Sequence, residues 1–440
     1  MQQRSANVRR TVLDLLVKAE TAGSYTNIAL DTAIKRNDFT PSDRALLTIL
    51  FYGVTEKKIT LDYIADTLSS IPPGKIELRT RNLLRMGIYQ LAFTDRIPAH
   101  AAVNETVSLA DKRSKGFVNA ILRRYIREGK RIVFPNASSD RIRFLSVKYS
   151  VCEALCKKLC NSYGFAECEK MLEAFSHTPP LTVRTNTLKT STDDLLSEIR
   201  KKYPDAERTT YARDGIKIPS CAVSGLAALE SGDCIVQDEA SQICTDVLGA
   251  KRGDVVSDVC ACPGSKSFGA AMTMENEGKI FAFDIHENKL SLILHGAKRL
   301  GITVISVQAH DARVPIPSLF GMLDRIICDV PCSGFGVISK KPELRYKDPA
   351  ESEKLPDIQL AILENVSQYL KAGGTLVYST CTVIPEENEG NIARFLEKHG
   401  DFELVPFEVG GVNAPKGYVT LMPHINGTDG FFIAKITKTL

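Results

Sequence analysis

The stretch YSTCTVIPEENE, residues Tyr378–Glu389, is the part of the sequence that best indicates the fold of the second half of the chain. The apolar run that leads into it, Thr375–Tyr378, predicts a buried strand. Pro385 and the carboxylates after it predict the first turn of a helix. Cys381 is then expected in a turn between a strand and a helix N-terminus, where open α/β sheets bind ligands and where a thiolate is favoured over a thiol. The alternative is a cysteine that packs as a small apolar residue.

The chain around this stretch, from Asp238 onward, alternates apolar runs with helical segments. Such alternation predicts a parallel sheet with helices on both faces. The expected strands are Val255–Val256, Lys279–Phe283, Val304–Val307, Asp324–Cys328, Thr375–Tyr378 and Gly430–Lys435. The expected helices are Gly269–Glu275, Glu287–Leu300, Leu355–Leu370 and Glu386–Glu397.

The residues before Asp238 form two further regions. From about Asn7 to Arg131 the apolar residues recur at helical spacing, which predicts a helical domain. This domain ends in a dense basic cluster that could neutralise phosphates, or could be a solvated helix face. Its candidate RNA-binding residues are Lys112, Arg113, Lys115, Arg123 and Arg124. A small α+β insert follows, with an expected strand at Leu181–Asn186.

Composition narrows the class of protein. The 440 residues amount to about three domains of roughly 150 residues each, and 44% hydrophobic with 25% charged residues is ordinary for a globular protein. No apolar run approaches a membrane span of about 20 residues, and the N-terminus offers no signal peptide, so we expect a cytoplasmic protein. The twelve cysteines are scattered along the chain and include no Cys-x-x-Cys pair. We therefore expect free thiols and predict no metal site. The net charge of +4 permits a nucleic-acid partner without demonstrating one.

A candidate cofactor site follows the first three of these strands. After the first comes a loop of small residues with one lysine, consisting of Cys260, Ala261, Cys262, Pro263, Gly264, Ser265 and Lys266. It matches neither the phosphate-binding P-loop nor the Gly-x-Gly-x-x-Gly dinucleotide motif. Asp284 ends the second strand, where a carboxylate suits ribose hydroxyls, and Asp311 follows the third. Together these residues predict a nucleoside-bearing cofactor across the sheet.

The fourth strand ends in Asp329-Val330-Pro331-Cys332-Ser333-Gly334, a sharper signal. Pro331 stiffens this turn and Gly334 permits unusual backbone angles. Because the fourth and fifth strands are expected to be neighbours, Cys332 and Cys381 should face one cleft. Lys340 and Lys341 follow, where they could meet a polyanion.

These motifs resemble those of the Nop/Sun family of RNA 5-methylcytosine methyltransferases, and the helical region resembles a NusB-like RNA-binding domain. Together they resemble the bacterial RsmB (Sun/Fmu) type, which acts on 16S ribosomal RNA. The resemblance implies a multidomain fold with an all-α NusB-like domain (1–134), linker helices with the α+β insert (140–236) and a C-terminal α/β Rossmann-like class I methyltransferase domain (237–440). It also implies S-adenosylmethionine as cofactor, bound by residues 260–266, Asp284, Asp311 and Asp329. Ser265 and Val330 depart from the family pattern, which has glycine and alanine there.

The same resemblance implies the catalytic residues. Cys381 is expected to add to C6 of cytosine and make C5 nucleophilic, which is covalent catalysis. Cys332 is expected to take part in release, and Asp329 to stabilise the charge that develops on the base.

Three alternatives stay open. A related enzyme could methylate transfer RNA, and a non-catalytic ribosome-assembly factor could keep the fold. The third alternative is a nicotinamide dehydrogenase, but the glycine motif that binds its dinucleotide is absent from this sequence. We expect 16S ribosomal RNA as the partner, no membrane contact, and a monomer.

Overall fold

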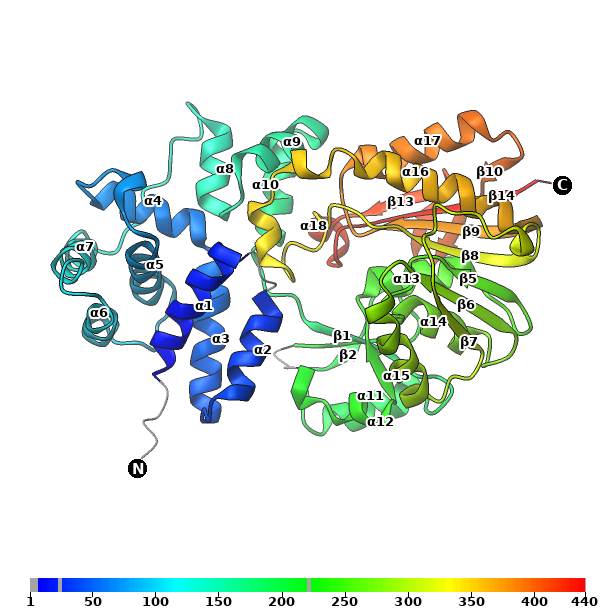
Figure 1. Ribbon diagram of the computed structural model, residues 1–440, viewed down its shortest axis with the longest axis horizontal. Coiled ribbons are helices and arrows are strands. Elements are labelled where there is room, and N and C mark those ends of the chain that lie inside the picture. Colours follow the sequence, from blue (N-terminus) through cyan, green and yellow to red (C-terminus); the bar gives the residue numbers. More distant parts are fainter. Residues whose placement is uncertain (1–6, 23–25, 220–222, 440) are drawn as a thin grey trace. The chain divides into compact units, whose positions relative to one another are not determined.

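A computed structural model describes residues 7–22, 26–219 and 223–439 (Figure 1). The chain divides into two compact units, of which the first holds residues 1–172 with 341–348 and the second holds 173–340 with 349–440. Among the described residues, no helix combines the length and the apolar character that crossing a membrane requires.

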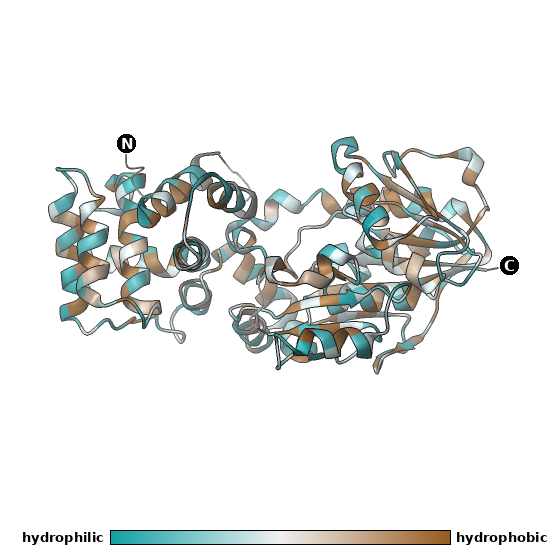
Figure 2. Cartoon of the chain, turned by 90° about the horizontal axis from the view of Figure 1, so that it is seen from below, coloured by the Kyte–Doolittle hydropathy of each residue, from teal (hydrophilic) through white to brown (hydrophobic). Residues whose placement is uncertain are grey.

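The first unit is helical, as its apolar spacing predicts. Its core joins side chains from α1 to α7, among them Leu13, Leu50, Ile64 and Leu84, which are buried. Figure 2 shows hydrophobic and hydrophilic patches alternating along these helices, as expected when one side of each helix faces a core. Its helices are α1 Val8–Ala22, α2 Thr26–Arg36, α3 Pro41–Glu56, α4 Lys58–Leu68, α5 Leu78–Phe93, α6 Ala99–Ser108, α7 Lys115–Arg127, α8 Arg141–Tyr149 and α9 Glu153–Tyr163, and α10 Phe165–Ala174 continues into the second unit.

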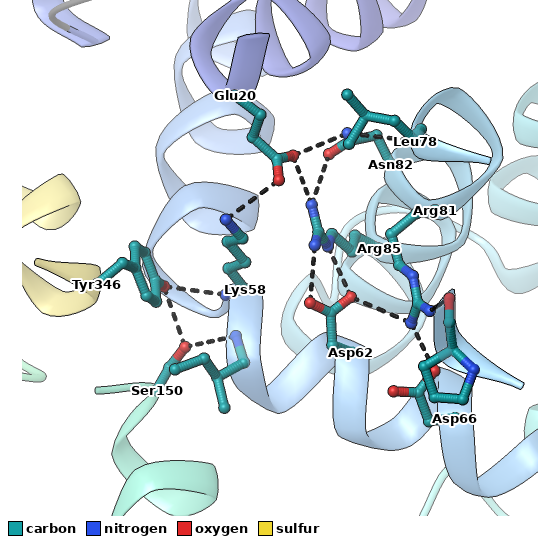
Figure 3. A network of polar contacts seen from close by, with 12 residues as sticks. Glu20, Lys58, Asp62, Asp66, Leu78, Arg81, Asn82, Arg85, Ser150 and Tyr346 are labelled. Carbon is teal, nitrogen blue, oxygen red and sulfur yellow. Dashed lines mark hydrogen bonds and ion pairs between the residues drawn. The ribbon is translucent and has the colours of Figure 1, made fainter. Parts of the chain in front are cut away.

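An ion-pair network lies inside this helical unit (Figure 3). Arg85 of α5 lies 2.6 Å from Glu20 of α1 and 2.7 Å from Asp62 of α4. Arg81, one turn earlier on α5, lies 2.5 Å from Asp66. Each arginine guanidinium is thus buried and paired with a carboxylate, as buried charges require.

A short segment from far along the chain, Lys341–Asp348, also belongs to the first unit. The Tyr346 hydroxyl donates to the Thr55 carbonyl at 2.5 Å and accepts from the Lys58 N–H at 3.1 Å. It also lies 3.1 Å from the Ser150 hydroxyl (Figure 3). The Lys58 N–H is one of the amides at the start of α4 that no carbonyl of its own helix can reach, so Tyr346 caps α4 from almost 290 residues away.

The second unit begins with the small α+β insert. Its four-stranded antiparallel sheet has the order β2-β3-β1-β4. Val183, Leu196 and Ile216 lie in its core. The elements are β1 Leu181–Thr185, α11 Thr192–Arg200, β2 Glu207–Arg208, β3 Gly215–Ile218, α12 Ala227–Ser231 and β4 Cys234–Val236.

The rest of the second unit is an α/β domain around a large sheet of order β10-β14-β9-β8-β5-β6-β7, with β13 paired to β14. Strands β5 to β9 are parallel, whereas β14 runs antiparallel to β9. The sheet is therefore mixed, and the strand expected at Gly430–Lys435 is its antiparallel member, which periodicity alone cannot show. The elements are α13 Glu239–Leu248, β5 Val255–Asp258, α14 Ser265–Thr273, β6 Lys279–Asp284, α15 Leu290–Leu300, β7 Ile305–Ala309, β8 Leu323–Asp329, α16 Leu355–Val366, β9 Leu370–Thr380, α17 Glu389–Lys398, β10 Phe402–Leu404, β11 Phe407–Val409, β12 Val412–Ala414, β13 Tyr418–Leu421, α18 Pro423–Asn426 and β14 Phe431–Lys438.

Helices cover both faces of this sheet (Figure 1). One core contains Ile243 of α13, Met272 of α14 and Ile293 of α15. The other contains Leu363 of α16 and Phe395 of α17. The expected layering is confirmed, and it leaves the loops at the carboxyl edge of the parallel strands free to carry chemistry.

Candidate active site

Two cysteines meet at the carboxyl edge of the sheet. Cys332 follows β8 and Cys381 follows β9, and these strands are parallel neighbours with Asp329 opposite Ser379. The two Sγ atoms lie 3.2 Å apart. The expected adjacency of the two strands is confirmed, and the turns after them bring two thiols together.

The thiol of Cys332 is held in its protonated form. The hydrogen bond with Cys381, followed by burial, raises the pKa of Cys332 well above its ordinary value. A protonated Cys332 can donate its S–H to the Cys381 sulfur, and such a donor favours negative charge on Cys381. The arrangement supplies one thiol donor and one acceptor sulfur that can become a nucleophile.

Asp329 lies between the two cysteine turns and the cofactor loop. Its Oδ2 accepts from Lys266 Nζ at 2.6 Å, and its Oδ1 accepts from Ser379 Oγ at 2.7 Å. Burial lowers the pKa of Lys266, but Asp329 more than offsets it, so the pKa is raised overall and the ammonium stays charged. The Lys266 ammonium also lies 5.2 Å from the centre of the Phe431 ring. Both oxygens of the partly exposed Asp329 side chain are thus hydrogen-bonded.

The cofactor loop, Cys260–Lys266, makes a tight turn between β5 and α14. The Cys262–Pro263 bond is cis, and Gly264 has φ of +108°, a conformation that favours glycine. A Cβ at Gly264 would lie 2.6 Å from the Phe268 ring. Ser265, which departs from the family pattern, is the first residue of α14 and has no positive φ, so no glycine is needed at that position. Val330, the other departure, is buried.

Asp284, at the end of β6, faces this loop. Its carboxylate accepts from the Cys262 N–H at 3.1 Å and from the His286 N–H at 2.9 Å. Burial alone raises the pKa of Asp284, but these hydrogen bonds hold it below its ordinary value. Asp311, after β7, is instead paired with the Arg313 guanidinium, with Nη2 2.6 Å from its Oδ2. The two carboxylates and the loop follow neighbouring strands, and their acceptor oxygens fit the hydroxyls of a ribose.

A set of residues that the sequence interpretation missed supports the cysteine turns. Glu387, which belongs to the predicted first turn of a helix, is buried. Its Oε2 accepts from the Ser333 N–H at 2.9 Å and from Gln359 Nε2 at 2.8 Å. The Ser333 and Thr382 hydroxyls lie 2.7 Å apart, which joins the two turns directly. The Pro-Glu-Glu-Asn sequence shortly after Cys381 is the feature of the sequence that could have indicated these supporting residues.

One expectation about this segment is wrong. Cys381 was expected beside a helix N-terminus, but Pro385–Glu387 forms a single 3₁₀ turn and α17 begins at Glu389. Asn388, with φ of −108° and ψ of −112°, interrupts the helical conformation between them. Cys381 therefore gains its polar environment from the Cys332 turn rather than from a helix dipole.

The candidate RNA-binding residues lie in both units. Lys112, Arg113, Lys115, Arg123 and Arg124 are exposed on α7 and the loop before it, in the first unit. Lys341 is exposed as well. Lys340, in the second unit, is instead paired with Asp238 at 2.5 Å and with Asp429 at 2.7 Å. Lys340 thus links Asp238 to Asp429 within the second unit, and it is less available to a polyanion.

Three family models match successive regions of the chain. The family model "16S rRNA methyltransferase RsmB/F" matches residues 245–437. The NusB family model matches residues 6–127, and a ferredoxin-like domain model of RsmF/B-like methyltransferases matches residues 153–224.

Individual relatives cover most of the chain. A probable ribosomal RNA small subunit methyltransferase B from Bacillus subtilis (strain 168) is 36% identical over 99% of both chains. Among solved structures, a methyltransferase homolog protein from Pyrococcus horikoshii is 29% identical, with a TM-score of 0.59 over 67% of this chain and 97% of that one. NSun6 from the same organism, solved with SFG, is 25% identical, with a TM-score of 0.57 over 66% of this chain and 98% of that one.

Proposed function

Because the chain belongs to the RsmB/F family of 16S rRNA methyltransferases, we propose that it transfers a methyl group from S-adenosylmethionine to C5 of a cytosine in 16S ribosomal RNA. The observation that carries this proposal is the pair of thiols 3.2 Å apart, with the Asp329 carboxylate at the neighbouring strand end. A methyltransferase acting on a nitrogen or a hydroxyl would need no second sulfur, whereas C5 of cytosine must first be activated.

The residues present fit the cofactor. Gly264 lets the loop turn tightly into α14 against the Phe268 ring, and Asp284 and Asp311 follow the next two strands. Residues 260–266, Asp284 and Asp311 would hold S-adenosylmethionine, with Asp329 nearest the reacting groups. The relative solved with SFG, an S-adenosylmethionine analogue, supports the same cofactor. When bound, it supplies an electrophilic methyl group on a sulfonium.

The proposed reaction begins with Cys381. Its thiolate forms a bond to C6 of a cytosine that has left its stack, and the ring electrons that moved from the C5–C6 double bond make C5 a nucleophile. Asp329 holds the base in place during this addition, because its carboxylate can accept from the amino edge of the ring. C5 then takes the methyl group.

The proposed release involves Cys332. Once Cys381 is bonded to carbon it is no longer a sulfur that accepts from Cys332, so one cause of the raised pKa of Cys332 is removed. Cys332 can then lose its own proton to solvent, and its thiolate takes the proton from C5. The electrons of that C–H bond re-form the C5–C6 double bond, and Cys381 leaves as a thiolate.

The proposal is tested by incubating the protein with methyl-labelled S-adenosylmethionine and 16S RNA and digesting the RNA to nucleosides. We expect label in 5-methylcytidine, and loss of this label to below about one thousandth in Cys381→Ala, as for removal of a covalent nucleophile. Cys160→Ala, which changes a partly buried cysteine of the first unit, is the matched control and should keep the activity. Label in another nucleoside, or none with the unaltered protein, would refute the proposed reaction.

A further inference from the structure

A pocket in the second unit is lined by none of the residues of the cofactor loop. Its volume is about 240 Å³. Most of its lining comes from His177–Pro180 with Thr182, from Asp238–Glu239 and from Gly427–Asp429, and Ser339 and Lys217 also contribute. None of these residues has a part in the proposed reaction. The volume is below the roughly 300–1,000 Å³ of sites for drug-sized ligands, which suits a single heterocycle.

Strand order places this pocket beside the thiols. The cofactor loops follow β5, β6 and β7, and the cysteines follow β8 and β9. Because β14 runs antiparallel to β9, with Phe432 opposite Thr380, the start of β14 lies at the edge that carries Cys381. Asp429 immediately precedes this start. Along one sheet edge the order is therefore cofactor loops, thiols and pocket.

Backbone hydrogen bonds connect the pocket wall to the thiol turns. The Gly336 N–H donates to the Cys381 carbonyl at 3.0 Å, and the Gly430 N–H donates to the Gly336 carbonyl at 2.8 Å. A Cβ at Gly336 would lie within 1.8 Å of the Gly430 carbonyl oxygen, so the two loops are in direct contact. A base bound next to Cys381 would have its chain neighbour beside this wall.

The chemistry of the lining selects what can enter. Asp238, Glu239 and Asp429 contribute carboxylates, of which Asp238 and Asp429 are shared with Lys340. Lys217 is the lysine of the lining, and it also pairs with Glu207 at 3.3 Å. Even with Asp238 and Asp429 paired to Lys340, the carboxyl groups outnumber the lysine of the lining, which disfavours a phosphate group, since like charges repel strongly where water is scarce. Hydroxyl and carboxylate oxygens instead favour a neutral ring that offers N–H donors.

We infer that this pocket is a subsite for the base of the nucleotide next to the target cytosine, and that it takes a base with an exocyclic amino group. The inference rests on the proposed function, because it assumes an unstacked RNA strand at Cys381. Pro179 and Pro180 contribute rigid apolar surface on which a planar ring can lie, while the oxygens accept from its amino edge. Specificity for the RNA sequence beside the target then comes from this pocket.

The test combines a filled pocket with a missing base. Short RNAs that carry the target cytosine are made with an abasic residue at each flanking position in turn. For the unaltered protein, one of these positions should raise KM about tenfold with kcat unchanged, because the contact is made equally in the ground and transition states. Ser339→Phe should raise KM for the intact RNA by a similar factor and should remove the effect of the abasic residue.

Two further variants make the test decisive. Thr178→Phe fills the same pocket from an exposed position, so it reports on the pocket even if Ser339→Phe does not fold. Ser318→Phe, at an exposed position of the same unit outside the pocket, should leave KM and the abasic effect unchanged. If the unaltered protein methylates intact RNA, but filling the pocket and removing the base raise KM additively, the subsite is overturned and the proposed function stands. No methylation of any RNA by the unaltered protein would overturn the proposed function as well.

Discussion

Two carboxyl groups near the sulfurs, Asp329 and Asp258, differ in their hydrogen bonds. Asp329 is paired on both oxygens, with Lys266 and with Ser379. Asp258, at the end of β5, receives a hydrogen bond from Ser267 Oγ at 2.6 Å on one oxygen, and its other oxygen has no partner among the described residues. The two carboxyl groups therefore differ in how completely their oxygens are hydrogen-bonded, although they lie at neighbouring strand ends.

Asp258 leads to a prediction about stability and pH. Burial raises the pKa of Asp258 to about 7. Its folded pKa then exceeds the unfolded value of about 3.9, so the folded protein binds more protons between these values. The free energy of unfolding should fall as pH rises from about 4 to about 7, by up to about 1.4 kcal/mol per pH unit from this group. Urea unfolding of the unaltered protein and of Asp258→Asn at several pH values measures the difference.

Asp258→Asn should become more stable relative to the unaltered protein as pH rises through this range, with no further change above it. The comparison isolates Asp258, because Asp429, whose pKa burial also raises to about 7, is present in both proteins. Equal pH slopes for the two proteins would show that Asp258 is charged in the fold.

At the scale of elements, periodicity predicted the five parallel strands and the helices between them to within a few residues, because each strand is an apolar run ended by polar turn residues. The same reasoning failed at Pro385–Glu389. A proline followed by carboxylates is typical of a helix start, yet Glu387 turns inward to receive the amide of Ser333, 54 residues away. A partner that distant in sequence leaves no mark in the local pattern.

Glu387 is therefore expected to position the Cys332 turn. Glu387→Ala leaves the Ser333 N–H and the Gln359 amide without their acceptor, which costs about 1–3 kcal/mol of stability. Because the cysteine turns move relative to each other, kcat should fall at least tenfold while the affinity for S-adenosylmethionine is kept. Glu387→Gln keeps an acceptor oxygen and should restore most of kcat.

Thermal unfolding and single-turnover methylation measure these effects, with Glu386→Ala as the control at the exposed neighbouring position. If Glu387→Ala lost stability but kept kcat, Glu387 would be a structural residue without a positioning role.

At the scale of the whole chain, the resemblance predicted a helical domain, an insert and a methyltransferase domain, and the family models match these three regions. It did not predict that Lys341–Asp348, eight residues of the C-terminal half, pack with the helices of the first unit. The Arg345 guanidinium donates to the Tyr149 carbonyl at 3.1 Å, and the Cys152 N–H donates to the Arg345 carbonyl at 2.8 Å. Such contacts depend on shape rather than on local sequence.

The cap that Tyr346 gives to α4 can be tested by hydrogen exchange. Tyr346→Phe removes the hydroxyl that accepts from the Lys58 N–H, and no carbonyl of α4 can replace it. We expect exchange of the Lys58 amide to accelerate about tenfold or more, equivalent to about 1.4 kcal/mol. The Ile59 amide, which donates to Ser150 Oγ, should change less.

Tyr63→Phe makes the same change within α4 at a hydroxyl that has no hydrogen bond among the described residues, and should leave Lys58 exchange as it is. Unchanged protection of Lys58 in Tyr346→Phe would show that the segment 341–348 does not cap α4.

The most direct test of the central proposal is the covalent complex itself. Cys332→Ala and Cys381→Ala are each incubated with target RNA and S-adenosylmethionine and then run on a denaturing gel. If Cys381 attacks C6 and Cys332 assists release, Cys332→Ala accumulates a protein–RNA complex that survives denaturation, and neither Cys381→Ala nor the double variant does. A stable complex formed by Cys381→Ala would contradict the assignment of the two sulfurs.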